Sequence, residues 1–126
     1  MPVRSLTSSV FKWPDAQMVN QAIRRWAAKM EQQHPETLQI GYFGSYAKGN
    51  WGVGSDLDLI IVVDHSSLPF TQRSVAWDTL ELPVPTDVCV YTQAEWDNMK
   101  RQAHRFYREV MREAIWVYQR KAVKGK

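Results

Sequence analysis

The sequence has a single cysteine and no long apolar run, and each scarcity excludes a class of protein. Cys89 is the only cysteine among 126 residues, so the chain can form no internal disulfide. No stretch approaches the roughly 18 apolar residues of a membrane-spanning helix. Residues 1–14 also lack the apolar segment of a secretory signal. These features predict a protein that has no membrane segment and works in the reducing cytoplasm.

Dense positive charge, metal-binding histidine spacing and sequence repeats are also missing. The net charge of +3 and the pI of about 9.1 fall short of the clustered Lys and Arg of a dedicated nucleic-acid binder, so direct nucleic-acid binding is not expected. The three histidines lie far apart in the sequence. The length and the hydrophobic content of 44% predict one domain over residues 1–126, with residues 1–12 and 120–126 poorly ordered.

Hydrophobic periodicity and proline placement predict alternating helices and strands. The predicted helical segments run from Asp15 to just before Pro35, from Pro69 to about Leu80, and from Thr92, with or without a break, to about Gln119. Thr92 and Glu95 have the spacing of a capping box. The predicted strands are Leu38–Phe43, Leu57–Val63 and Thr86–Tyr91. Because Leu57–Val63 is apolar on both faces, it is predicted to be central.

Glycines are concentrated after the first predicted strand. Five of the six glycines fall within residues 41–54, which indicates backbone conformations or close approaches that a side chain would prevent. Gly44 and Ser45 would open a short helical turn through Lys48, with free N–H groups and the Ser45 hydroxyl available to phosphate. A Gly-Ser pair alone is more typical of an ordinary turn, so the residues around it must decide.

Three aspartates stand near the starts of two predicted strands. Asp56 and Asp58 are two residues apart, so their side chains leave the same face, and Asp87 has a similar place in the third strand. Neighbouring carboxylates without a cation would repel one another. Mg²⁺ prefers such oxygen ligands and completes its shell with water and phosphate oxygens. The pattern therefore predicts a Mg²⁺ site, although Asp-Leu-Asp alone also fits a solvated strand start.

The strand directions can be predicted if the three aspartates and the Gly44-Ser45 turn are to lie at one edge of the sheet. The helical connection between Leu57–Val63 and Thr86–Tyr91 would make these two strands parallel neighbours, with their aspartates at one edge. Gly44 and Ser45 reach that edge only if the first strand runs antiparallel to the second. The expected fold is therefore α/β (α+β), with a small mixed three-stranded sheet flanked by about four helices.

The spacing of these residues resembles a known family. Gly44-Ser45, ten intervening residues and then Asp56-Leu57-Asp58 resemble the signature of the polymerase-beta-type nucleotidyltransferase superfamily. Within it, the spacing is similar to that of the minimal nucleotidyltransferases of MNT/HEPN toxin–antitoxin systems. The likeness spans residues 41–91 and, more loosely, the order of helices and strands.

The resemblance implies a role for each residue of the motif. Asp56, Asp58 and Asp87 would be catalytic ligands of one or two Mg²⁺ ions, with Asp87 also the base. The family often has Arg around the positions of Tyr46 and Lys48, so here the basic contact falls to Lys48 alone. The nucleotide-binding residues implied are Gly44, Ser45, Lys48 and Ser55.

The resemblance also implies an activity and a partner. ATP would donate AMP to a tyrosine of a HEPN-type toxin, which makes the chain an AMPylating antitoxin. Two alternatives stay open at this point. One is a non-catalytic antitoxin that acts by binding its toxin, and the other is a small-molecule nucleotidyltransferase completed by homodimerisation.

The last predicted helix carries two apolar stripes and a row of arginines. One stripe would pack on the sheet, and the other would be core or a partner surface. The arginine row would be a solvated face or a contact for an acidic partner. The stripes are Ala103, Phe106, Val110, Ala114 and Val117, and Tyr107, Met111, Ile115 and Tyr118; the arginines are Arg101, Arg105, Arg108 and Arg112.

Overall fold

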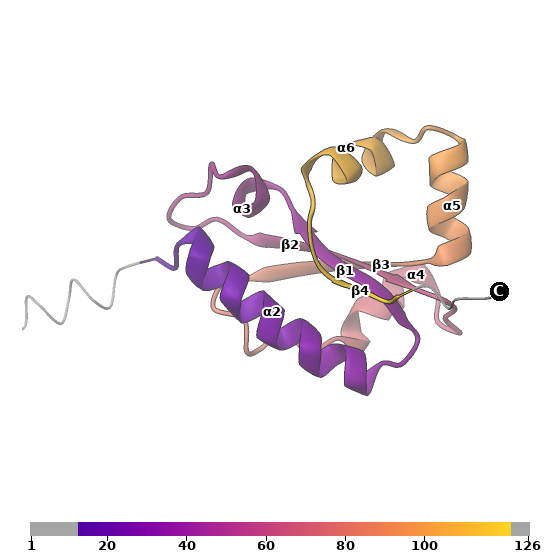
Figure 1. The fold of residues 1–126 in the computed structure, drawn as a ribbon, viewed down its shortest axis with the longest axis horizontal. Coiled ribbons are helices and arrows are strands. Elements are labelled where there is room, and N and C mark those ends of the chain that lie inside the picture. The colour runs from indigo at the N-terminus through magenta and orange to yellow at the C-terminus, as the bar shows by residue number, and fades with distance from the viewer. Residues whose placement is uncertain (1–12, 122–126) are drawn as a thin grey trace, which may run out of the picture.

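The computed structural model describes residues 13–121, in which a four-stranded mixed sheet has helices on both faces (Figure 1). The strand order is β3-β2-β1-β4, where β1 is Thr37–Phe43, β2 is Leu57–Val63, β3 is Thr86–Thr92 and β4 is Ile115–Gln119. The predictions of poor order for residues 1–12 and 122–126 lie outside the described residues, whereas residues 120 and 121 are described. Within the described range, no helix combines the length and the apolar character needed to cross a membrane.

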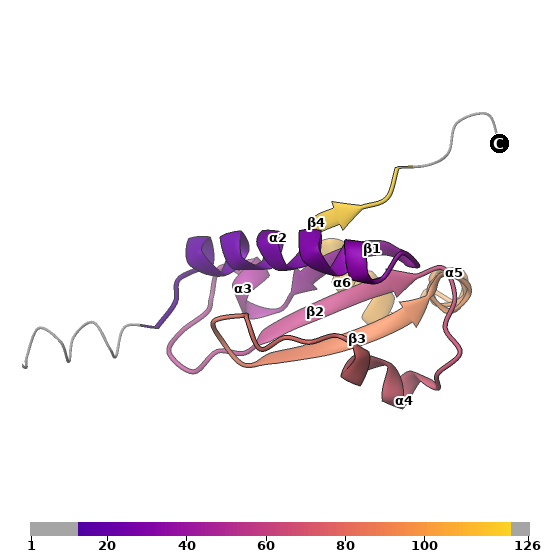
Figure 2. The ribbon, with the colours of Figure 1, turned by 90° about the horizontal axis from the view of Figure 1, so that it is seen from below.

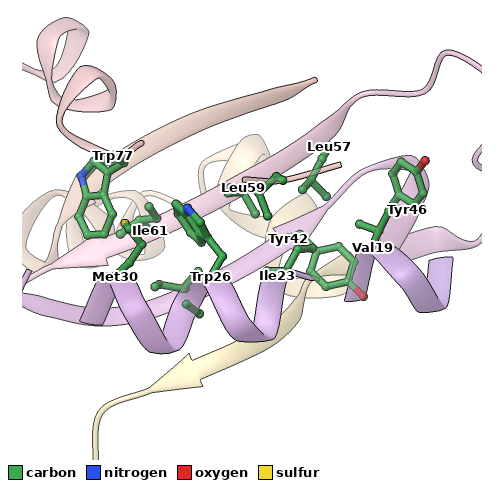
Figure 3. Close-up of a cluster of buried hydrophobic side chains, with 14 of the residues drawn as sticks. Val19, Ile23, Trp26, Met30, Tyr42, Tyr46, Leu57, Leu59, Ile61 and Trp77 are labelled. Atoms are coloured by element: carbon green, nitrogen blue, oxygen red, sulfur yellow. The ribbon is translucent and has the colours of Figure 1, made fainter. Parts of the chain in front are cut away.

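Helix α2, Ala16–Gln33, covers one face of the sheet, as Figure 2 shows. It begins at Asp15, whose side chain caps the helix by accepting a hydrogen bond from the Met18 N–H at 2.9 Å. Its buried side chains form one stripe at helical spacing, made up of Val19, Ile23, Trp26, Ala27 and Met30. Figure 3 shows this stripe packed against β2 and against Trp77.

The three predicted strands are confirmed, as are their directions. Strand β1 is Thr37–Phe43, β2 is Leu57–Val63 and β3 is Thr86–Thr92. Strand β2 pairs antiparallel with β1 and parallel with β3. Six of the seven residues of β2 are buried, and they point to both faces of the sheet, which agrees with its predicted central place.

The prediction of a final helix to about Gln119 is wrong, and the sheet has a fourth strand. Helix α5 is Gln93–Arg101, helix α6 is Arg105–Glu113, and the chain then extends into β4, Ile115–Gln119. Strand β4 pairs antiparallel with β1. The free edge of β1 offers unpaired backbone groups, which a β-branched and aromatic segment satisfies well.

The side chains of β4 do not follow the predicted helical stripes: they alternate between the two faces of the sheet up to a bulge in the pairing with β1, beyond which Val117 and Tyr118 lie on the same side. Ile115 and Val117 pack in the core beneath α2, whereas Trp116 packs on the opposite face with α5 and α6. Gly41 of β1 makes room for the Trp116 ring: a Cβ added there would lie 2.6 Å from Trp116 Cε3. The apolar positions after Glu113 therefore serve two cores, and one helical face could not reach both.

The predicted helix from Pro69 to Leu80 is much shorter than expected. Helix α4 covers only Phe70–Arg73, and a 3₁₀ turn, η1, follows at Ser74–Ala76. The backbone of Trp77 is extended, and its ring stacks on His34 at a centroid distance of 3.9 Å. Burial of this large ring against α2 outweighs the helical preference of the following residues.

Arg73 ties this segment to the start of α5. The Arg73 guanidinium donates to both carboxylate oxygens of Glu95, at 2.6 and 3.0 Å, and its side chain is only 8% exposed. It also donates to the carbonyls of Leu68 and Val90. Glu95 completes the predicted capping box with Thr92, so one carboxylate serves both the helix start and the buried cation.

We predict that Gly41→Ala destabilises the protein by about 1–3 kcal/mol, because the added methyl group would overlap the Trp116 ring. The matched control is Gly52→Ala, where nothing lies within 4 Å of an added Cβ and the change should stay within about 0.5 kcal/mol. Urea unfolding measures both. Equal stabilities of the two variants would contradict the pairing of β4 with β1.

Stability should also depend on pH through Glu95, whose pKa is lowered, chiefly by its hydrogen bonds from Arg73. The stabilisation from this pair is present above the ordinary carboxyl pKa of 4.5 and is lost as the pH falls through the lower folded value. Glu95→Gln should therefore cost about 1–3 kcal/mol at pH 7 and progressively less below pH 4.5. Urea unfolding at a series of pH values measures this difference.

The control for this series is Glu81→Gln, which removes one partner of the exposed Lys29–Glu81 ion pair. Its effect should stay below about 1 kcal/mol at pH 7. A difference between wild type and Glu95→Gln that does not shrink in acid would show that the Arg73 contact does not stabilise the ionised carboxylate.

Candidate functional site

Asp58 and Asp87 lie side by side at one edge of the sheet. They are partners in the parallel register of β2 and β3, and neighbouring strands lie about 4.8 Å apart. Phe43 of β1 is the partner of Asp58 on the other side. The three side chains therefore leave one face of the sheet in a row, and this face is the one covered by α5 and α6.

Asp56 stands just before β2 and acts on Asp58 through its charge. The pKa of Asp58 is raised, first by burial and then by the negative charges of Asp87 and Asp56. Asp58 is half-buried, whereas Asp56 and Asp87 are exposed. The structure thus brings the three predicted aspartates into one electrostatic neighbourhood, where their charges repel.

The donor set of this neighbourhood fits a hard cation. Within residues 13–121, no group of three or more His, Cys, Asp or Glu side chains is gathered closely enough to hold a metal ion. Carboxylate oxygens are the ligands that Mg²⁺ prefers, and a cation would remove the repulsion that raises the pKa of Asp58.

Gly44 brings the glycine-rich turn against Asp58. Its φ of +79° is left-handed, and a Cβ added there would lie 2.5 Å from Asp58 Oδ2. Gly44 caps the short helix α3, Ser45–Lys48, which is the helical turn predicted from the sequence. Only a residue without a side chain allows both this conformation and this approach. The predicted phosphate turn and the predicted carboxylates are therefore direct neighbours.

The other predicted nucleotide-binding residues are placed unequally. Ser45 is half-buried at the first position of α3, and Lys48 is exposed at its last. The Ser55 hydroxyl oxygen accepts a hydrogen bond from the Gly52 N–H at 2.7 Å, and so it closes the loop before β2. The Ser55 hydroxyl is thus engaged within its own loop, whereas the Lys48 side chain is exposed at the end of α3.

Sequence reasoning missed Glu113, the last residue of α6. Its Oε1 accepts a hydrogen bond from the Gly44 N–H at 3.3 Å, although the two residues are 69 positions apart. Its Oε2 lies 3.9 Å from Lys48 Nζ. One sequence signal exists: an acidic residue at a helix C-terminus opposes the helix dipole, which suggests a partner outside the helix.

A cavity of about 250 Å³ adjoins the carboxylates. Its lining joins Asp58 and Asp87 to an apolar and aromatic wall formed by Phe43, Cys89, Tyr91 and Phe106. Burial, followed by the charges of Asp58 and Asp87, raises the pKa of Cys89 to about 12, so this residue is a neutral thiol in the wall. A second cavity, of about 370 Å³, lies at the far ends of β2 and β3, around Arg73 and Trp77.

Residues 23–117 match the family model of the nucleotidyltransferase domain, and the chain therefore belongs to this family of transferases. Two solved structures are similar in fold. One is described as a nucleotidyltransferase from Sulfolobus solfataricus. It is 16% identical in sequence, the alignment covers 83% of this chain and 84% of that protein, and the TM-score is 0.60. The other is a mutant MntA-HpeT toxin–antitoxin. It is 17% identical in sequence, the alignment covers 75% of this chain and 71% of that chain, and the TM-score is 0.51. No curated protein matches the chain.

We predict that Gly44→Ala destabilises the protein more than Gly54→Ala does. Both glycines have a positive φ, +79° and +88°, and Gly44 also has a ψ of −153°, a region almost restricted to glycine, so its substitution carries a backbone penalty of about 1–3 kcal/mol. Only the Gly44 substitution also pushes against the Asp58 carboxylate, which should add about 1 kcal/mol or more. Urea unfolding compares the two, and equal losses would contradict the close approach of the turn to Asp58.

Proposed function

We propose that the chain is a cytoplasmic, Mg²⁺-dependent enzyme that transfers AMP from ATP to the hydroxyl of a tyrosine on a HEPN-type toxin, and so acts as an antitoxin. The observation that carries this proposal is the meeting of Asp58, its neighbour Asp87 and the Gly44 turn at one edge of the sheet. Membership of the nucleotidyltransferase family supports the reaction class.

Each residue of the site has a distinct task in this reaction. Asp56, Asp58 and Asp87 would hold Mg²⁺, which offsets the negative charge that grows on the phosphate oxygens. Backbone N–H groups at Gly44 and Ser45 bind the β- and γ-phosphates, and Lys48 adds a positive charge beside them.

The transfer itself is one displacement at phosphorus. The acceptor oxygen bonds to the α-phosphorus as the bond to the bridging oxygen of the β-phosphate breaks, and pyrophosphate leaves with that electron pair. Asp87 takes the proton of the acceptor hydroxyl. Asp87 is exposed at the strand edge, so an acceptor carried by another molecule can approach it.

The shape of the site favours an aromatic acceptor brought by a partner. The cavity beside Asp58 and Asp87 has an aromatic wall that includes Phe43, Tyr91 and Phe106, against which a flat ring can pack. The likeness in fold to a toxin–antitoxin structure agrees with a toxin as the partner.

A second candidate is an antitoxin that neutralises its toxin by binding alone. The likeness in fold to a toxin–antitoxin structure agrees with this candidate as well. The two differ in one outcome. Neutralisation of the toxin by an Asp56→Asn/Asp58→Asn double variant that still forms the complex would select the binding function. A small-molecule transferase completed by homodimerisation is the remaining alternative, and a dimer that labels no protein would identify it.

We predict that Asp58→Asn reduces label transfer from α-labelled ATP to the partner to below about 1% of wild type, because the central carboxylate is lost. The fold should persist, since the substitution removes a charge that Asp56 and Asp87 repel. The control is Asp97→Asn on α5, which keeps the oxygen that accepts from Gln93. Transfer by Asp58→Asn at the wild-type level would refute the catalytic assignment.

A further inference from the structure

The carboxylate of Glu113 already occupies the turn that the proposed function gives to phosphate. One oxygen accepts from the Gly44 N–H at 3.3 Å, and the other lies 3.9 Å from the Lys48 ammonium. The Glu113 side chain is 17% exposed, compared with 47% for Lys48. The Glu113 carboxylate is thus held, largely out of solvent, against Gly44 and Lys48, two of the predicted nucleotide-binding residues.

The position of Glu113 in its own helix makes this contact informative. Glu113 is the last residue of the nine-residue helix α6, where the helix dipole disfavours a negative charge. The favourable interactions of its carboxylate therefore come from the Gly44–Lys48 turn and not from α6. A carboxylate at a backbone N–H and a cation is chemically similar to a phosphate oxygen in the same place.

We propose that Glu113 is an internal counter-ion of the Gly44–Lys48 turn, and that the phosphates of a nucleotide bind there by displacing its carboxylate. This inference rests on the proposed function for the identity of the ligand. It makes Glu113 a residue that sets nucleotide affinity: ligand phosphates must compete with a group that is always present at high effective concentration.

A purely structural role for Glu113 predicts the opposite effect on binding. If the carboxylate only holds the turn in shape, its removal loosens the turn and weakens phosphate binding. If it is displaced by the ligand, its removal destabilises the free protein but strengthens phosphate binding. The sign of the change in affinity therefore separates the two roles.

The test measures binding of inorganic tripolyphosphate and of ATP to the full chain by calorimetry. Glu113→Gln keeps an oxygen that can accept from the Gly44 N–H but removes the charge, and Glu113→Ala removes both. We expect the dissociation constants of both ligands to fall about three- to tenfold in each variant. An unchanged or larger dissociation constant in both variants, or no binding to any of them, would overturn the proposal.

The matched control is Glu109→Gln, one turn earlier on the same helix. This carboxylate pairs with Arg105 and is 47% exposed, so its removal changes the net charge equally without touching the turn. Its dissociation constants should stay within about twofold of wild type at physiological salt, where distant charges are screened. A gain in Glu109→Gln equal to that in Glu113→Gln would assign the effect to net charge and overturn the proposal.

A second measurement separates this inference from the transfer reaction. In the ligand-free protein, the amide resonance of Gly44 should shift in Glu113→Ala and stay in place in Glu109→Gln. Tighter phosphate binding with this shift, but without label transfer by wild type, would support the internal counter-ion and reject only the proposed enzyme activity. An unmoved Gly44 resonance would overturn the counter-ion itself.

Discussion

The parallel pairing of β2 with β3 is the constraint on which the site depends, because it places Asp58 next to Asp87. Two neighbouring carboxylates repel, so the register must be held by something stronger. Leu57, Leu59 and Ile61 enter the core beneath α2, and Ile60 and Val62 enter the core beneath α5 and α6. A slip of one residue would exchange the two faces and bury Asp58 beneath α2. Apolar burial on both faces of β2 therefore fixes the position of the charged site.

The glycine-rich turn adds a second constraint, of space rather than of charge. Gly44 approaches the Asp58 carboxylate so closely that any side chain at this position would overlap it. The sheet and the turn consequently have to form together, since β1 leads into Gly44 and pairs with the strand that carries Asp58. The glycine-rich turn and the aspartate of β2 are thus packed against each other as one structural unit.

Much of this arrangement could be predicted from local sequence, and the rest depends on distant partners. Helix α2 and strands β1 to β3 carry their own periodicity, and the short motif from Gly44 to Asp58 indicates the kind of site. Strand β4 was mistaken for a helix because Ile115–Tyr118 continues an apolar pattern, and only the open edge of β1 makes it a strand. The early end of α4 depends on the packing of Trp77 on His34. The acidic end of α6 indicates a partner outside that helix, but nothing in the local sequence identifies Gly44, 69 positions away, as that partner.

Strand β4 begins two residues after Glu113, and this connection limits how the Glu113 carboxylate can leave the turn. Ile115 is the register partner of Tyr42, which stands two residues before Gly44. The backbone segments that carry Gly44 and Glu113 are thus held next to each other by the pairing of β1 with β4. Release of the carboxylate requires rotation about the side-chain bonds of Glu113, which is only 17% exposed, and leaves the pairing of the strands unchanged. A charged ligand could therefore enter the turn without a rearrangement of the fold.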